Sequence, residues 1–307
     1  MTMLTTPFNT DERAAQVLSG YGELMGAPIR AAMPEQHRSF FAGLQYLFVG
    51  ALDETGGPLA TVLTGPPGFV RSPDPETLVV HALPAASDPA TPGIAIGSDV
   101  ALLGIDLSNR RRNRANGTVV AKDEASFTIH VEQSFGNCPK YIQRRNVEVA
   151  TRSPGQLEES NGLDEAARAL IARSDTFFIA SRARPGVQEA ARVDVSHRGG
   201  LPGFVTIDSD ERLIVPDYRG NRFFNTLGNL LGDPRATLLF IDFEQGDLLQ
   251  VQGLVTIDWS RENSGGSRIV ERAWRFEVRK SWRRRAAIPL KWQFIDYSTA
   301  LLRDQER

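Results

Sequence analysis

The sequence contains a single cysteine, Cys138, among 307 residues, so no disulfide can form within the chain. It has no apolar run near the ~18 residues that a membrane-spanning helix needs. Its first residues show neither the basic nor the apolar region of a secretion signal. Lys and Arg number 35 against 37 Asp and Glu, and the net charge of −2 creates no field that would attract nucleic acid or an anionic membrane. We therefore expect a cytoplasmic protein with no membrane or nucleic-acid partner.

Motifs for metal, nucleotide and hydrolytic chemistry are also missing. The sequence has four histidines, which are His37, His81, His130 and His197. They do not lie at metal-ligand spacing from one another or from Cys138, so we expect no metal site. No Walker loop and no G-x-S-x-G elbow is present. The glycine-rich residues 20–26 do not form a dinucleotide loop, because Met25 stands where the third glycine belongs.

The most informative feature that is present is an internal repeat. Four pairs of segments correspond in order: LFVGA at 47–51 with FFIAS at 177–181, PGFV at 67–70 with PGFV at 202–205, LLGID at 102–106 with LLFID at 238–242, and GTV at 117–119 with GLV at 253–255. The last three pairs are offset by 135 or 136 residues, and the first by 130 because one hairpin loop is longer in the second copy. A period this long indicates duplicated domains, since solenoid repeats are much shorter.

Each copy opens with a helical stretch and continues as short strands separated by Gly, Pro and Asp. We expect a mainly β fold with flanking helices, in which two modules pack face to face as a pseudo-dimer within one chain. The expected boundaries are an N-terminal helical extension at 1–33, a first module at 34–151, a linker at 152–162, a second module at 163–271 and a C-terminal extension at 272–307.

The best candidate for anion binding is the segment 215–225, VPDYRGNRFFN. A strand is expected to end at Val215 and a helix to begin near Asn221, so backbone amides and the guanidinium groups of Arg219 and Arg222 would meet at one turn. A polar helix cap with solvated arginines explains the same pattern. The counterpart in the first copy, residues 87–93, contains no arginine, as a functional difference between the copies would produce.

The opposite difference occurs at the end of the first copy, where residues 133–145 read QSFGNCPKYIQRR and nothing similar ends the second copy. Cys138 in this run has no histidine near it in sequence to activate it, so we interpret it as an inert packing residue. Basic clusters at 109–114 and 279–285 are interpreted as solvated faces rather than nucleic-acid sites.

Three segments carry a resemblance to a known family: MPEQHRSFF at 33–41, SFGNCPKYIQRR at 134–145, and the stretch from RVDVSHRGGLPGFV at 192–205 to LLFID at 238–242. Over roughly residues 33–280 the chain resembles the pyridoxamine 5′-phosphate oxidase-like FMN-binding split barrels, and within them a duplicated flavin-nucleotide-binding subgroup. The resemblance implies two tandem split β-barrel modules with FMN held between them.

The resemblance also implies which residues hold FMN. From the second module it implies Arg192, Ser196, Val215, Pro216, Asp217, Arg219, Asn221 and Arg222, and from the first module Gln133, Ser134, Asn137 and Lys140. Arg222 stands where the family places a phosphate-binding Lys or Arg. Gly220-Asn221 replaces the Ser-Arg common in the oxidases, and residues 282–292 do not reproduce their Trp and Arg pair, so pyridoxamine phosphate oxidation is not expected.

We expect an FMN-dependent oxidoreductase that acts on a small redox substrate, with NAD(P)H as the candidate electron donor. His197 and Tyr218 are candidate proton donors, with hairpin-turn residues as the alternative interpretation. The alternative functions are a flavin-binding carrier or redox sensor without turnover, and a structural barrel whose site has decayed. The chain is expected to be a monomer or a homodimer.

Overall fold

The structure is a computed structural model and describes residues 3–4, 7–186, 193–260, 267 and 269–305. Its first module is an open seven-stranded antiparallel sheet preceded by the helix α2 (Glu35–Ala42). Its strands are β1 (Tyr46–Leu52), β2 (Pro58–Thr64), β3 (Val70–Arg71), β4 (Thr77–Val80), β5 (Asp99–Asp106), β6 (Arg111–Lys122) and β7 (Phe127–Gly136). In β7, buried Phe127, Ile129 and Val131 alternate with less buried polar residues, so one face of the strand joins the module's core.

The second module repeats this plan. Its helix α3 (Glu165–Arg173) begins at Asp164, whose carboxylate accepts a hydrogen bond of 2.7 Å from the Ala167 amide. Its strands are β10 (Thr176–Arg182), β11 (Val193–Gly199), β12 (Thr206–Ile207), β13 (Leu213–Tyr218), β14 (Arg235–Ile241), β15 (Leu248–Asp258) and β16 (Val270–Arg284). One helix, α4 (Asn225–Gly232), lies between β13 and β14, where the first module has only turns.

The strand order shows the duplication directly. The first sheet runs β2-β1-β5-β6-β7-β4-β3 and the second runs β11-β10-β14-β15-β16-β13-β12, which is the same order element by element. The registers agree as well, because Leu103 pairs with Arg114 in the first sheet and Leu239 pairs with Gln250 in the second. The expectation of two tandem split-barrel modules is therefore confirmed, and both sheets are open rather than closed.

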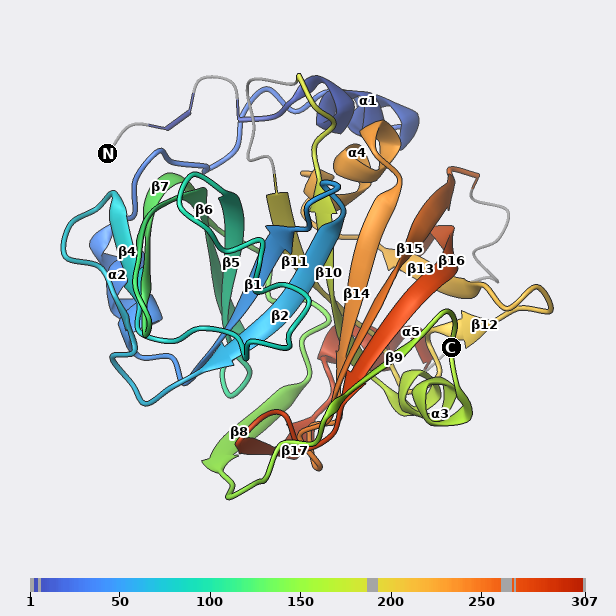
Figure 1. Ribbon diagram of the computed structural model, residues 1–307. Coiled ribbons are helices and arrows are strands. Elements are labelled where there is room, and N and C mark those ends of the chain that lie inside the picture. Colours follow the sequence, from blue (N-terminus) through green and yellow to red (C-terminus); the bar gives the residue numbers. More distant parts are fainter. Residues whose placement is uncertain (1–2, 5–6, 187–192, 261–266, 268, 306–307) are drawn as a thin grey trace.

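The two modules pack against each other through the faces of β1, β2 and β5 and of β10, β11 and β14 (Figure 1). Phe48 of β1 stacks on its own counterpart, Phe178 of β10, with ring centroids 3.5 Å apart. A residue that meets its own copy lies beside the axis relating the copies, so a pseudo-twofold axis passes between these rings. The interface has an apolar core to which both modules contribute.

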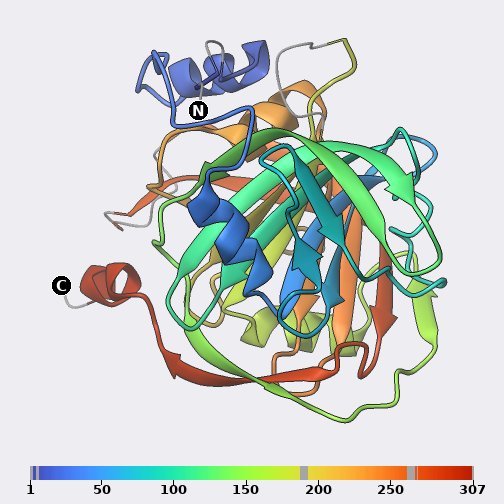
Figure 2. The same cartoon turned by 90° about the vertical axis from the view of Figure 1, so that its left-hand side faces the viewer.

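Segments outside the two sheets tie the modules together. At one end, α1 (Thr10–Leu18) lies on α4, as Figures 1 and 2 show. At the opposite end, β17 (Leu290–Asp296) returns to pair with β8 (Arg144–Val149), and α5 (Thr299–Gln305) follows. Across the described ranges, no helix combines the length and the apolar character needed to cross a bilayer.

Two features differ from the expected element bounds. The boundary expected between residues 271 and 272 falls inside β16, which continues to Arg284 with Trp274 and Phe276 buried in the module's core. The expected linker at 152–162 contains β9 (Leu157–Ser160), which pairs with β16. We propose that the second module extends to residue 284, because β16 is continuous to that point. The basic residues 279–285 hide the continuing strand from a reading of the sequence alone.

Candidate functional site

A pocket opens at the junction of the two modules, and the first residues of α4 line part of it. Residues of both modules line it: Arg112, Arg114, Asn137, Cys138, Lys140 and Tyr141 from the first, and Ser196, His197, Arg198, Gly199, Phe204, Pro216, Asp217, Tyr218, Gly220, Asn221, Arg222, Phe224, Asn225, Thr226, Leu227, Glu271 and Arg272 from the second. Six of these side chains are Arg or Lys and two are carboxylates, so the pocket is strongly basic. A basic pocket in a chain of net charge −2 points to an anionic ligand.

A buried ion pair joins the modules at the inner end of the pocket. Arg114 of β6 lies 2.6 Å from Asp194 of β11, and both side chains are less than a tenth exposed. Arg114 also donates to Ser196, whose hydroxyl lies 2.8 Å from that of Thr226 in α4. A buried guanidinium needs such a set of acceptors, because its desolvation is otherwise uncompensated. The network therefore fixes β6, β11 and α4 relative to one another.

The two carboxylates of the lining are already paired within the protein. Asp217 of β13 accepts from Arg198 and, at 2.7 Å, from Arg272. Glu271 accepts from Arg219 at 3.0 Å and from the Tyr21 hydroxyl. Arginine side chains therefore already hydrogen-bond both groups within the protein.

Four buried polar atoms of the lining have no hydrogen-bond partner among the described residues. They are Nε of Arg112, Nε of Arg114, Oδ1 of Asn137 and Nε2 of His197. The Arg112 guanidinium donates once, at 2.6 Å, to the carbonyl of Cys138. Buried polar groups without partners are rare in folded proteins, and their convergence on one pocket indicates a ligand that satisfies them.

The ionisation states of the inner pocket follow from its burial. Burial, reinforced by Arg112, Arg145 and Arg198, holds the pKa of His197 well below its usual range. The imidazole is therefore neutral at physiological pH. Burial also lowers the pKa of Arg112, to about 9, with the charge of Arg114 adding to the effect, so the guanidinium remains a cation near neutrality.

The turn between β13 and α4 forms the outer wall of the pocket. Arg222 (φ 65°) and Phe224 (φ 60°) are left-handed, which reverses the chain so that α4 begins at Asn225 rather than near Asn221. The residue before the helix is Phe224, and it offers no side-chain cap. The first amides of α4 are thus not capped by the side chain that precedes them, and Thr226 and Leu227 of this first turn line the pocket.

The pocket brings together nine of the residues expected from the sequence. They are Asn137, Lys140, Ser196, His197, Pro216, Asp217, Tyr218, Asn221 and Arg222. Arg192 lies outside the described residues.

Four expected residues lie elsewhere. Ser134 hydrogen-bonds His37 at 2.8 Å, and Gln133 precedes it on β7 without lining the pocket. Val215 points into the core of the second module, and Arg219 is paired with Glu271.

Sequence reasoning missed the two arginines of β6 that line the pocket. Arg112 and Arg114 belong to the cluster at 109–114 that was expected to be a solvated face, and this expectation is wrong for Arg114, which is 5% exposed. The available signal was their spacing, because residues two apart on a strand share one face. The sequence analysis found no histidine close to Cys138 along the chain. In the structure, Cys138 and His197 nevertheless line the same pocket.

Comparison with known proteins supports the fold assignment. Residues 163–288 match the sequence model of the family described as pyridoxamine 5′-phosphate oxidase. No curated protein matches the chain.

Three solved structures that match the chain each align with between 34% and 42% of it. A putative pyridoxamine 5′-phosphate oxidase from Lactobacillus delbrueckii is 23% identical, over 34% of this chain and 95% of its own, with a TM-score of 0.27. HupZ from Group A Streptococcus is 17% identical, over 34% and 94%, with a TM-score of 0.28. A FAD-binding protein from Mesorhizobium loti is 12% identical, over 42% and 97%, with a TM-score of 0.27. No functional conclusion follows from likenesses this distant.

The resemblance seen in the sequence and the family match point the same way, and the matched residues 163–288 include α3, α4 and all the strands from β10 to β16. The second module, repeated in the strand order of the first, therefore belongs to the pyridoxamine 5′-phosphate oxidase-like split-barrel family.

Proposed function

We propose that the protein is an FMN-dependent oxidoreductase that holds one flavin in the pocket between its modules. The observation that carries this proposal is the convergence of four unpartnered buried polar atoms, from both modules, on one basic pocket. FMN offers matching chemistry, because its phosphate is anionic and its ring edge carries both hydrogen-bond donors and acceptors. The family to which the second module belongs is a flavin-binding one, which supports the same assignment.

The residues of the pocket divide into two groups that suit the two ends of FMN. Arg222, Asn221 and the first amides of α4 would hold the phosphate, because they combine a guanidinium with the backbone donors of a helix N-terminus that Phe224 does not cap. Arg112, Asn137 and His197 would meet the polar edge of the ring, since each has an unpartnered buried atom. The same division leaves no direct role for Gln133, Ser134, Val215 or Arg219.

A bound flavin would supply the electron transfer, and the protein's part is to bind and orient the flavin and to adjust its surroundings. His197 is neutral, so it can form a hydrogen bond but holds no imidazolium proton to transfer. Arg112 and Lys140 place positive charge in the pocket, which favours an anionic form of a ligand beside them. A small redox substrate, with NAD(P)H as electron donor, would enter from the open side.

A flavin carrier or redox sensor without turnover is the second candidate. It is favoured by one observation: both lining carboxylates are ion-paired and His197 is neutral, so these three groups offer no ready general acid or base.

The test begins with purified protein and excess FMN. We expect a yellow protein that retains about one FMN per chain, quantified after release, because one composite pocket is built. A protein that retains no flavin contradicts the proposal, and two per chain contradicts the single site. Anaerobic addition of NADH or NADPH then separates the candidates, since bleaching of the flavin absorbance indicates an enzyme and a stable spectrum indicates a carrier.

A further inference from the structure

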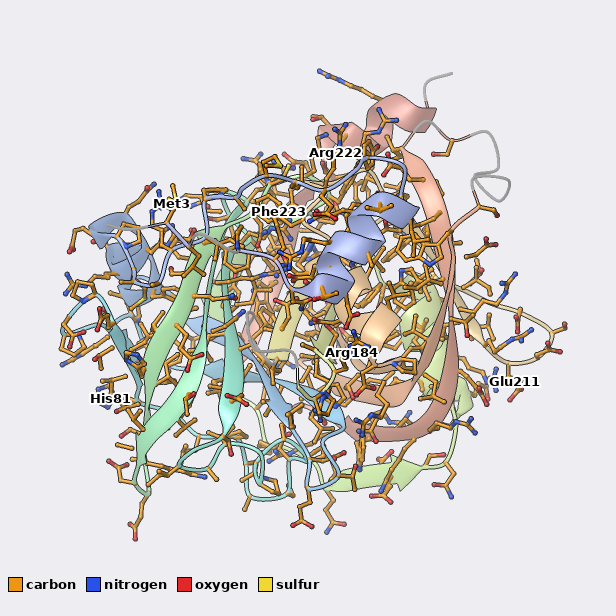
Figure 3. All side chains as sticks on the ribbon, turned by 90° about the horizontal axis from the view of Figure 1, so that it is seen from above. Met3, His81, Arg184, Glu211, Arg222 and Phe223 are labelled. Atoms are coloured by element: carbon orange, nitrogen blue, oxygen red, sulfur yellow. The ribbon has the colours of Figure 1, made fainter. Side chains whose placement is uncertain are left out.

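An N-terminal arm, residues 7–30, covers the outer wall of the pocket. Gln16 of α1 donates to the Phe223 carbonyl at 3.2 Å, and the ring of Phe8 contacts that of Phe223 at 5.5 Å between centroids. The Arg222 guanidinium lies 3.9 Å from the centroid of Tyr21. Seen from above, Arg222 and Phe223 lie beside this arm (Figure 3). The arm thus contacts the turn assigned above to the flavin phosphate.

One carboxylate, that of Glu12, lies at the centre of this contact. Glu12 is 3% exposed and closes a capping box with Asn9, each side chain accepting from the other residue's amide at 2.8 Å. Its second oxygen accepts from the side-chain amide of Asn225, the first residue of α4, at 2.6 Å. A Cβ at Gly228 would lie 2.5 Å from the Glu12 Cα, so only glycine lets α1 approach α4 this closely.

The charged groups around Glu12 come from three elements. Asp194 of β11 and Arg114 of β6 act on it with opposite sign. Asp11 of its own helix is paired with Arg184 at 2.9 Å. The α4 contacts are the Asn225 amide and the Gly228 backbone, neither of which is ionisable. Burial raises the pKa of Glu12 to about 7, so its charge changes near neutral pH.

A carboxyl in this position carries a stability cost. Its pKa in the folded protein lies above the ordinary value of 4.5, so the free energy of unfolding falls as the pH rises from about 4.5 through about 7. Glutamine can form a capping box, but it has a single acceptor oxygen, whereas Glu12 accepts from the Asn9 amide with one oxygen and from Asn225 with the other. Glutamate also adds an ionisation that a capping box does not need.

We infer that Glu12 is a positioning residue that couples FMN binding to the uptake of a proton. Neutral Glu12 lets the start of α4 receive the phosphate, whereas ionised Glu12 adds a buried negative charge, bonded to Asn225, behind the same turn. By linkage, binding of the anion favours the protonated carboxyl, and raising the pH weakens binding. The inference rests on the proposed function, since it assigns the phosphate to this turn.

The experiment compares wild type with Glu12→Gln, and uses Glu23→Gln as a control that removes the same charge from an exposed position on the same arm. FMN dissociation constants are measured between pH 6 and 8. The phosphate of FMN titrates equally with every variant, so the ratio of wild-type to Glu12→Gln dissociation constants isolates Glu12. We expect this ratio to rise up to about tenfold from pH 6 to pH 8, and Glu23→Gln to follow wild type.

Calorimetry at pH 7 in two buffers of different ionisation enthalpy gives the protons taken up on binding. We expect wild type to take up more protons per FMN than Glu12→Gln. A constant ratio of dissociation constants, or equal proton uptake by the two proteins, overturns the inference while leaving FMN binding intact. Absence of FMN binding by wild type at every pH is the separate result that removes the proposed function, and this inference with it.

Discussion

The pseudo-twofold axis creates two equivalent positions at the junction of the modules, and they have diverged completely. At the pocket, β6 and β11 contribute Arg112, Arg114, Asp194, Ser196 and His197. The corresponding residues of β15 and β2, identified by strand register, are Leu248, Gln250, Leu59, Thr61 and Val62. The buried ion pair and the neutral imidazole of one position are replaced by aliphatic residues and two neutral polar groups in the other.

The second position is also filled. Trp282, which is 7% exposed, packs there with Leu59 and Ala90, and β9 lies against its strand. The polar groups are satisfied internally, because Gln250 donates to the Ala60 carbonyl at 2.8 Å and to Asp88 at 3.1 Å. A dimer of identical chains would have to keep both positions alike. Joining the copies in one chain allowed one position to become polar and open while the other became a packed core.

The largest expected effect tests the polar position against its counterpart. Arg114→Met should lower the free energy of unfolding by about 3–5 kcal/mol, because Asp194 would remain buried without its partner. The matched variant Gln250→Met should cost only about 1–2 kcal/mol, since Asp88 keeps its bonds to Thr61 and to the Ala90 amide. Urea denaturation measures both. Equal losses would mean that the ion pair does not distinguish the two positions.

A second variant attempts to reopen the filled position. Trp282→Ala should lower the unfolding free energy by about 3 kcal/mol, because it removes a large buried side chain. We expect the protein to retain one FMN per chain, since Leu248 and Val62 still occupy the places of Arg112 and His197. Two bound FMN would show that the tryptophan alone closes the second position.

The outer turn offers a comparison between two neighbouring arginines. Arg222→Ala should weaken FMN binding about ten- to hundredfold with little change in stability, because a charge-assisted phosphate contact is worth roughly 1.5–3 kcal/mol. Arg219→Ala is the control, because Arg219 is paired with Glu271 and does not line the pocket. Fluorescence titration of FMN measures both affinities. A larger loss from Arg219→Ala would move the phosphate to that residue.

The smallest expected effect concerns the thiol of the pocket. Cys138→Ala should keep FMN affinity within about threefold and any turnover unchanged, because the Cys138 backbone carbonyl, and not its side chain, accepts from Arg112. Asn137→Ala is the contrast, since it removes an unpartnered oxygen that would face the ligand. Turnover lost in Cys138→Ala with FMN still bound would reveal a working thiol.

The duplication was predictable because it rests on local patterns. Each PGFV segment leads into a short strand and each LLxID segment lies in a core strand, so the two copies could be aligned without any knowledge of packing. The asymmetry around residues 133–145 and 215–225 was visible for the same reason. Asn137, Lys140, Asn221 and Arg222 now share one pocket.

What could not be predicted depends on packing between distant elements. Arg114 meets Asp194, 80 residues away, across the interface, and its spacing from Arg112 places both on one face of β6 without telling which face is buried. Glu12 carries an ordinary capping-box pattern, and only the approach of α4 desolvates it. The end of the second module was obscured because charged residues continue a strand whose other face is buried.

The pairing of β17 with β8 has a consequence for the order of events during synthesis. Leu290 meets Val149 in this ladder, so β8 leaves the ribosome long before its partner exists. Until then, the last strand of the first half has an open edge, and open edges invite pairing with other nascent chains. Closing a loop this long comes late in folding. A truncated product that stops before residue 290 would therefore be prone to aggregate, even though both sheets are encoded in it.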